Sequence, residues 1–480
     1  MRTTLLTICL LALAAAPAAQ ASSTMRTLFQ DDGRILRSGE AAREAALDEI
    51  AAEGAEVLKL HVVWADVAPG GATKPEGFSG HELSSYSEAA FAPYDAAIRG
   101  AKARGLDVLL APTPPAPGWA TAERGDERGV YRPSAREYGR FVRALATRYD
   151  GNHGLPRVTM WTFGNEPNHP DFLQPLGSRR GTYIAPHLYR EMVRHGLAGL
   201  RLAGHAKDTI LFGETLPIGK RRPGPRNTIS PVTFIREFFC LDRRWRPYRG
   251  RAARIRDCDG FKRISGLSGY AHHPYTRPGG PRTRETSRED AQIQSLSRIT
   301  KALDRAAARR RLAGRRMRVY ITEFGFQSDP PDRFWTPIAR IPAYLSESEW
   351  IAWRNRRVAT WSQYALVDDV ALSGFQSGLR FADGSEKPGV YDAYRRPFFV
   401  RLRGSRSVEV WGGVRAGGRG DVVEVQQRLG RRGEWRKLRT LRLNARGYFR
   451  ATIRISRADD REYRFVAGTA ASREARASRR

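Results

Sequence analysis

Residues 157–167 read RVTMWTFGNEP and residues 317–326 read MRVYITEFGF, so that each apolar segment runs directly into a glutamate. Short apolar segments of the same kind recur along the chain, at residues 55–63, 106–111, 209–213, 267–272 and 358–364. Segments with helical periodicity lie between them. Strands and helices that alternate about eight times predict a sheet of parallel strands joined by helical crossovers.

The clearest helical pattern occupies residues 134–150. Ser134 and Glu137 form a capping box, apolar residues then recur at helical spacing, and Gly151 ends the segment. Similar patterns are found at residues 41–53, 186–203 and 289–310. The alternation extends over residues 25–400, and this length fits a closed (β/α)8 TIM barrel with several long loops. A doubly wound sheet is the alternative, but no G-x-G-x-x-G motif follows the first strand.

The pattern changes after residue 400. Short alternating strands separated by Gly-rich turns follow, without helical periods between them, and they predict a small C-terminal β-sandwich over residues 401–467. Residues 468–480 are polar and rich in Arg, so we expect them to form a disordered basic tail.

The first residues have the features of an export signal. Arg2 precedes an apolar run at residues 5–16, and the sequence Ala-Gln-Ala ends at Ala21. These features predict a cleavable signal peptide at residues 1–21. The alternative, a membrane anchor, requires about 20 apolar residues, which is more than this run contains. We therefore expect a secreted, extracellular protein without a membrane span.

Two cysteines remain once residues 1–21 are removed. Cys240 and Cys258 lie close together in the sequence, and in an exported chain such a pair predicts a disulfide. A pair of buried free thiols is the alternative.

The chain is strongly basic. Its 480 residues include 82 Lys and Arg against 50 Asp and Glu, which gives a net charge of +32. The Arg residues are spread along the chain and belong to no nucleic-acid-binding module, so we expect no nucleic acid as a partner. Attraction to cell-wall polymers or other anionic glycans fits the charge better, although solvated basic surfaces are the usual alternative. We expect a monomer.

The two glutamates at strand ends carry the chemical prediction. In a parallel barrel the carboxyl ends of the strands meet at one mouth, where catalytic groups lie. Glu166 follows the fourth strand and Glu323 the seventh, so both side chains are predicted to enter this mouth. Two carboxyl groups, one protonated and one ionised, suit the cleavage of a glycosidic bond. The alternative is that each glutamate is a solvated loop residue or an ion-pair partner of an Arg.

The motifs around these glutamates resemble those of a known group of enzymes. Asn165-Glu166-Pro167 and Thr322-Glu323-Phe324-Gly325 are similar to signatures of the retaining glycoside hydrolases of clan A, nearest to the cellulase-like family 5 and the xylosidase-like family 39. The resemblance covers the predicted barrel alone. It implies that Glu166 is the acid/base, that Glu323 is the nucleophile, and that Asn165 binds the sugar 2-hydroxyl.

Further matches extend the resemblance. His272-His273-Pro274-Tyr275 is similar to the H-x-Y element of the clan, which implies that Tyr275 hydrogen-bonds the nucleophile and that His273 contacts the sugar. Trp361 in the eighth strand resembles the Trp that floors the subsite of the cleaved sugar. The alternatives are a structural histidine at His273 and an outward-packed aromatic residue at Trp361.

One position departs from the resemblance. The clan usually has an Arg near the nucleophile on the second strand, where this chain has Lys59. Lys keeps the positive charge but lacks the guanidinium fork, so either activity is weakened or another Arg supplies the support. Glu214, at the end of the fifth strand, is a third carboxylate that we expect to bind a substrate hydroxyl, unless it is only a bystander in the barrel mouth.

The sequence contains no motif of the other reaction types that we considered. The His and Cys spacing matches no zinc site, no G-x-S-x-G elbow occurs between a strand and a helix, and no nucleotide-binding loop is present. We therefore expect neither a metal nor a cofactor. The sequence predicts a secreted retaining glycosidase that acts on a poly- or oligosaccharide by double displacement. A catalytically silent glycan- or cell-wall-binding protein on the same barrel is the alternative.

Overall fold

The structure of the protein is a computed structural model that describes residues 24–122, 128–314, 316–456 and 461–479. The predicted signal peptide at residues 1–21 lies outside the described residues. No helix in the described part of the chain combines the length and the apolarity that crossing a membrane requires.

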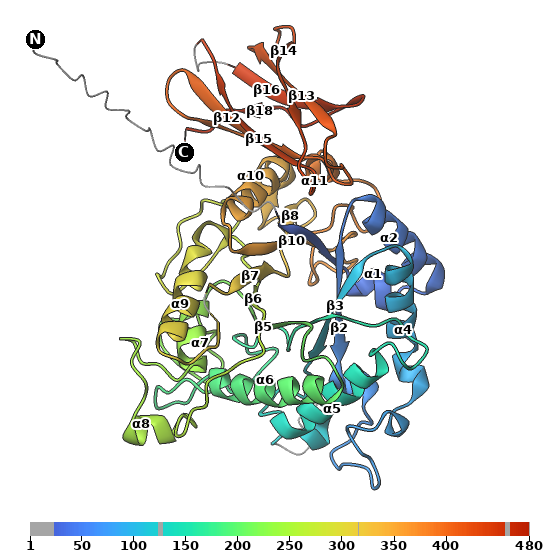
Figure 1. Ribbon diagram of the computed structural model, residues 1–480, viewed down its shortest axis with the longest axis vertical. Helices are drawn as coiled ribbons and strands as arrows, with labels where there is room; N and C mark the ends of the chain where they lie inside the picture. Colours follow the sequence, from blue (N-terminus) through green and yellow to red (C-terminus); the bar gives the residue numbers. More distant parts are fainter. Residues whose placement is uncertain (1–23, 123–127, 315, 457–460, 480) are drawn as a thin grey trace, which may run out of the picture.

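Eight parallel strands close into a barrel, as predicted (Figure 1). Their order around the barrel is β1-β10-β7-β6-β5-β4-β3-β2. The strands are β1 (Arg26–Gln30), β2 (Val57–Val63), β3 (Asp107–Thr113), β4 (Met160–Trp161), β5 (Thr209–Thr215), β6 (Gly269–His272), β7 (Arg318–Ile321) and β10 (Val358–Tyr364). The two short strands β8 (Ser328–Asp329) and β9 (Thr336–Pro337) pair with each other in a loop after β7.

Helices surround the barrel and connect its strands (Figure 1). They are α1 (Asp32–Leu36), α2 (Glu40–Ala52), α3 (Trp64–Val67), α4 (Glu88–Ala103), α5 (Ala135–Arg148), α6 (Ala185–Leu202), α7 (Pro231–Phe238), α8 (Gly250–Arg254), α9 (Ser297–Ala308), α10 (Ile341–Arg354) and α11 (Val390–Arg395). The helix predicted to begin at residue 289 starts later, as α9, because residues 289–296 form a loop and one short 3-10 turn.

The start of α5 shows half of the predicted capping box. Ser134 Oγ accepts a hydrogen bond from the backbone N–H of Glu137 at 3.3 Å. The Glu137 carboxylate turns away and binds Lys74 and Arg140 instead. The second half of the box is lost because these two cations offer the carboxylate stronger, charge-assisted partners.

The barrel encloses an apolar interior. Its buried residues come from six different strands and are Leu28, Val57, Leu109, Met160, Leu211 and Ala271. A much larger apolar layer lies between the strands and the helices. Because the interior is filled with side chains, the only room for a ligand on the barrel axis is at the mouth formed by the carboxyl ends of the strands.

The C-terminal part is a β-sandwich, as predicted. One sheet has the order β11-β12-β15 and the other β14-β13-β16-β17, with β18 also paired to β16. The strands are β11 (Phe398–Leu402), β12 (Ser407–Gly413), β13 (Val422–Leu429), β14 (Arg436–Arg442), β15 (Tyr448–Arg454), β16 (Arg461–Ala467), β17 (Ala470–Ala471) and β18 (Ala475–Arg476). The change of pattern after residue 400 therefore falls inside β11, whose first residues already belong to the sandwich.

The expectation of a disordered tail does not hold for residues 468–479. β17 and β18 pair with β16, and the backbone N–H of Ser478 donates to the carbonyl of Val400. The Arg-rich composition did not predict these strand pairs. A strand as short as β18 needs only a few backbone hydrogen bonds and one buried side chain, here Ala475.

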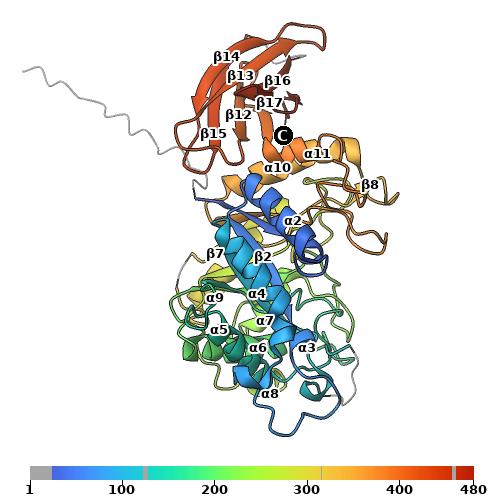
Figure 2. The ribbon, with the colours of Figure 1, turned by 90° about the vertical axis from the view of Figure 1, so that its right-hand side faces the viewer.

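The sandwich packs on α10 and α11 at the outer side of the barrel (Figures 1 and 2). Arg415, just after β12, places Nη2 2.8 Å from both carboxylate oxygens of Glu349 on α10. The hydroxyl of Tyr448 on β15 donates to the same carboxylate at 2.5 Å. All three side chains are buried almost completely, so this ion pair fixes the sandwich to the barrel away from water.

Candidate active site

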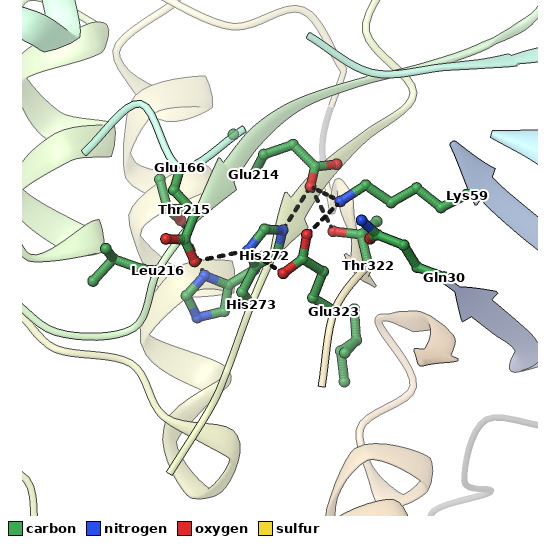
Figure 3. Close-up of polar contacts among 12 residues, drawn as sticks. Gln30, Lys59, Glu166, Glu214, Thr215, Leu216, His272, His273, Thr322 and Glu323 are labelled. Atoms are coloured by element: carbon green, nitrogen blue, oxygen red, sulfur yellow. Dashed lines mark hydrogen bonds and ion pairs between the residues drawn. The ribbon is translucent and has the colours of Figure 1, made fainter. Parts of the chain in front are cut away.

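Glu166 and Glu323 converge at the barrel mouth, as Figure 3 shows. Glu166 lies in the loop after β4 and Glu323 directly follows β7. One carboxylate oxygen of Glu166 lies within 4.8 Å of one carboxylate oxygen of Glu323. Glu166 has a φ of 35°, and Glu214 has a φ of 46°. Such left-handed backbone at a non-glycine residue costs about 1–3 kcal/mol and is concentrated at functional sites.

Lys59 lies beneath the pair and bridges two carboxylates (Figure 3). Its Nζ donates to Oε2 of Glu214 at 2.8 Å and to Oε1 of Glu323 at 3.0 Å. The Lys59 side chain is fully buried and Glu323 is nearly so. Burial by itself lowers the pKa of Lys59, but the attraction of Glu214 and Glu323 outweighs it and holds the pKa above its ordinary value. Lys59 is therefore a buried cation.

His273 contacts all three carboxylates. Its Nδ1 is 3.0 Å from Oε1 of Glu166 and 3.4 Å from Oε2 of Glu323, and its Nε2 is 2.6 Å from Oε2 of Glu214. Burial opposes protonation of the ring, yet the charge of Glu323 and the hydrogen bonds to Glu166 and Glu214 raise the pKa of His273 to about 9. The ring is therefore a second buried cation at neutral pH.

Lys59 and His273 lower the pKa values of the carboxyl groups that they contact. Burial alone raises the pKa of Glu323, but His273 and Lys59 reverse this effect and hold the pKa below its usual value. The same cations outweigh burial at Glu214 and hold the pKa of that carboxyl far below its usual value. Thr322 Oγ1 also donates to Glu214, at 2.9 Å. Both Glu214 and Glu323 are thus ionised at neutral pH.

A cavity of about 780 Å³ opens above these residues. Asn165, Glu166, Tyr275 and Glu323 line it. The hydroxyl of Tyr275 donates to Oε2 of Glu323 at 3.3 Å, which is the contact that the sequence resemblance implied. Oδ1 of Asn165 is buried and makes no hydrogen bond among the described residues, so it remains available to a ligand hydroxyl.

Solved structures with the same architecture include glycoside hydrolases. A GH5_18 protein from Streptomyces cattleya, in complex with GlcNAc, has a TM-score of 0.50 and 16% identity, over 78% of this chain and 80% of its own. The chain shares its fold with glycoside hydrolases. A GH1 beta-glucosidase from the fungus Humicola insolens, in complex with glucose, aligns with a TM-score of 0.45 and 12% identity, over 77% of this chain and 96% of its own. No protein-family model and no curated protein matches the sequence.

Three of the predicted site residues do not reach the cavity. Lys59, Glu214 and His273 are buried and do not line it. The Glu214 side chain is fully buried and has no surface that a substrate hydroxyl could reach, and Lys59, His273 and Thr322 all contact its Oε2. These residues instead hold Glu166 and Glu323 in place from below. Among the described residues no Arg contacts Glu323 in its place; Lys59 itself contacts the carboxylate of Glu323.

The prediction that Trp361 floors a sugar subsite is also wrong. Residues that are paired across two neighbouring strands point to the same face of the sheet. Leu28, which points into the barrel, is paired with Ser362. Trp361 therefore points outward, where its ring packs 4.9 Å from that of Phe324. Tyr364 has the inward parity and lines the cavity in its place. The prediction placed the aromatic residue on the correct strand but on the wrong face.

Asp32 and His61 are site residues that the sequence analysis missed. Oδ2 of Asp32 lies 2.9 Å from Nδ1 of His61, and Nε2 of His61 lies 4.0 Å from Oε1 of Glu323. Both residues line the cavity. A signal was present in the sequence: Asp32 follows the first strand closely, and His61 lies two positions after Lys59, on the same face of its strand.

Two clusters have the residue types of a metal site. Glu166, His273 and Glu323 form one, and His187, Cys240 and Cys258 form the other. His273 is protonated at neutral pH, and a protonated imidazole offers no lone pair to a metal. Cys240 and Cys258 form the predicted disulfide, so neither provides the thiolate that a metal requires. The donor chemistry therefore favours neither cluster as a metal site.

Proposed function

We propose that the protein is a retaining glycosidase that cleaves O-glycosidic bonds of a poly- or oligosaccharide by double displacement. The spacing of Glu166 and Glu323 is the observation that carries the proposal. Retaining enzymes hold their two carboxyl groups about 5–5.5 Å apart, whereas inverting enzymes need about 6.5–9.5 Å to admit a water molecule. Oxygens that lie within 4.8 Å of each other fit the first arrangement.

Glu323 is the nucleophile in this proposal. Lys59 and His273 keep its carboxylate ionised, and Tyr275 fixes one of its oxygens. The carboxylate attacks the anomeric carbon while Glu166 gives its proton to the departing glycosidic oxygen. Glu166 then takes a proton from a water molecule, which attacks the same carbon and releases the sugar from Glu323. Each carboxyl group ends the cycle in its starting state.

The buried charges balance in the state that starts this cycle. With Glu166 protonated, the ionised Glu214 and Glu323 face the cations Lys59 and His273. Buried charges are tolerated when they are paired and hydrogen-bonded. In the proposed cycle the two buried anions thus have two buried cations as partners, and one neutral with two ionised carboxyl groups is the distribution that double displacement needs.

Covalent trapping tests the proposal. We expect a 2-deoxy-2-fluoroglycoside with a good leaving group to label Glu323, with the added mass recovered on its peptide. Glu323→Ala should abolish hydrolysis and keep the native circular dichroism spectrum. Glu166→Ala should slow glycosides with poor leaving groups far more than activated aryl glycosides. Polysaccharide binding without labelling by any sugar of the panel would instead favour the silent glycan-binding alternative.

We propose further that the protein is exported and associates with anionic cell-wall glycans. The Cys240–Cys258 disulfide supports an oxidising compartment. A hollow of about 620 Å³ among the loops that follow β6 is lined by several basic residues, namely Arg282, Arg284, Arg288 and Arg298. Binding to an acidic polysaccharide should weaken steeply as salt is raised, and binding that is insensitive to salt would contradict this association.

A further inference from the structure

A second cavity of about 540 Å³ adjoins the catalytic one. Tyr275 and Phe375 line both cavities, so the two are neighbours at these residues. We call the second cavity the annex. Its walls come from the segments that follow β5, β6, β7 and β10, and its apolar residues are Leu216, Pro217, Ile218, Pro278, Phe326, Phe334, Trp335 and Phe375.

The annex differs chemically from the catalytic cavity. Several Asp, Glu and Arg residues line the catalytic cavity, namely Asp32, Arg37, Asp66, Glu166, Asp171 and Glu323. Among the described residues that line the annex, Arg277 is the only one of these types. Some polar groups there are already engaged: Ser377 Oγ donates to the carbonyl of Tyr364, and Gln327 accepts from the backbone of Gln376. Oε1 of Gln292 is buried there without a partner among the described residues, so the annex offers isolated polar contacts on walls that are mainly apolar.

Three of the exposed apolar side chains, Phe334, Trp335 and Phe375, line the annex. Nine large hydrophobic residues are exposed in the described chain, and five of them are Phe334, Trp335, Val370, Leu372 and Phe375. Phe334 is 89% exposed, Phe375 48% and Trp335 38%. All five belong to two segments, residues 334–335 and 370–375. Exposed apolar groups that cluster beside a polar cavity indicate a binding surface rather than chance exposure.

The position of the annex identifies which part of a substrate it faces. Asn165, Asp32 and His61 lie on the side of the catalytic cavity formed by β1, β2 and β4, where polar groups suit the hydroxyls of the cleaved sugar. The annex lies on the opposite side, after β5 to β10. We place the cleaved sugar against these polar groups, so that the aglycone, on the other side of the scissile bond, reaches the annex past Tyr275, which lines both cavities.

We infer that the annex binds an apolar aglycone, so that the substrates include glycosides of alkyl or aromatic alcohols. This inference rests on the proposed function, because it assigns the leaving-group side of the same catalytic pair. Burial of the aglycone removes apolar surface from water on both partners. Each methylene that is fully buried improves binding by about fourfold.

Matched glycosides test the inference. Methanol and octanol differ little as leaving groups, so the methyl and n-octyl glycosides of a sugar that the enzyme hydrolyses differ mainly in apolar length. We expect kcat/KM to be more than about tenfold higher for the octyl glycoside, which requires burial of only a few methylenes. In Glu323→Gln, which cannot turn over, dissociation constants of octyl and 2-naphthyl glycosides separate alkyl from aromatic preference.

Surface variants locate the effect. Phe334→Ser with Trp335→Ser should lower the octyl-to-methyl ratio at least about threefold. Leu429→Ser in the sandwich, where the side chain is 61% exposed, is the matched control and should leave the ratio unchanged. Equal kcat/KM for the two wild-type substrates, or an unchanged ratio in the double variant, would overturn the inference while leaving the glycosidase proposal intact. An equal loss on an oligosaccharide would identify a sugar subsite instead and also overturn it.

A failure of the proposed function is recognised separately. If the wild-type protein hydrolyses no glycoside, its binding of n-octyl β-D-glucoside below the micelle concentration is compared with that of methyl β-D-glucoside. Tighter binding of the octyl compound that the double variant loses would support the annex without catalysis. Equal binding of both compounds would refute it.

Discussion

Nζ of Lys59, on β2, lies 3.0 Å from Oε1 of Glu323, which follows β7. The strands β1 and β10 separate β2 from β7 around the barrel. A lysine ammonium is a compact charge that holds one oxygen of a carboxylate, whereas an arginine fork holds two. Here Tyr275 contacts the other oxygen of Glu323, at 3.3 Å. The carboxylate is therefore oriented from two directions without a guanidinium group.

Replacement of Lys59 should damage both stability and catalysis. Lys59→Met leaves Glu214 and Glu323 buried beside each other without this cation, and breaking a buried pair in this way costs about 3–5 kcal/mol. The pKa of Glu323 should rise, so the acid limb of the pH profile of kcat/KM should move to higher pH. Chemical unfolding and the pH profile measure the two effects. Lys102→Met, which breaks the exposed pair with Asp107, should cost less than about 1 kcal/mol.

His273 should make stability depend on pH on the alkaline side. Its folded pKa of about 9 exceeds the value of about 6.5 in an unfolded chain, so protonation favours the folded state. The stabilisation is complete below about pH 6.5 and is lost as pH rises through about 9. Melting temperatures across this range should fall for the wild type and fall less for His273→Gln. A parallel decline in both proteins would contradict the assignment, and exposed His153 offers a control substitution.

Trp361 and Tyr275 should respond differently to mutation. Trp361→Phe removes part of an outward-facing core side chain and should cost about 1–3 kcal/mol of stability, with KM unchanged within about twofold. Tyr275→Phe should leave stability nearly intact and lower kcat, because it removes a hydrogen bond to Glu323. Thermal unfolding and steady-state kinetics of the two variants decide the matter. A large rise of KM in Trp361→Phe would restore the sugar-platform assignment.

The strands, the helices and the sandwich were predictable because each rests on local periodicity and turn residues. Glu166 and Glu323 were also predictable to meet, because the carboxyl ends of parallel strands share one mouth. The face of Trp361 was not, since a shift of one residue in a strand exchanges its two faces. The burial of Glu214 was equally unpredictable, because it depends on Lys59, which lies on β2, and on His273, which directly follows β6.

Asp32 and His61 show a further limit of sequence analysis. Neither residue belongs to a motif, and their relation exists only because β1 and β2 are adjacent and in a register that pairs Gln30 with Lys59. The tail is a similar case, since β18 is defined by its pairing with β16 and not by its own composition. Contacts between segments, rather than properties of one segment, account for what the sequence did not predict.

The contact of the sandwich with the barrel should depend on the buried Glu349–Arg415 pair. Arg415→Met leaves the carboxylate of Glu349 buried with only the Tyr448 hydroxyl as partner, which should cost about 3–5 kcal/mol. Replacing all three groups together, by Glu349→Leu, Arg415→Met and Tyr448→Phe, removes every unpaired polar atom and should recover most of that loss. Denaturant unfolding of the intact chain, followed by tryptophan fluorescence, measures both variants. If the triple variant is as unstable as the single one, the pair itself stabilises the junction, and the cost does not come from an unpaired buried charge.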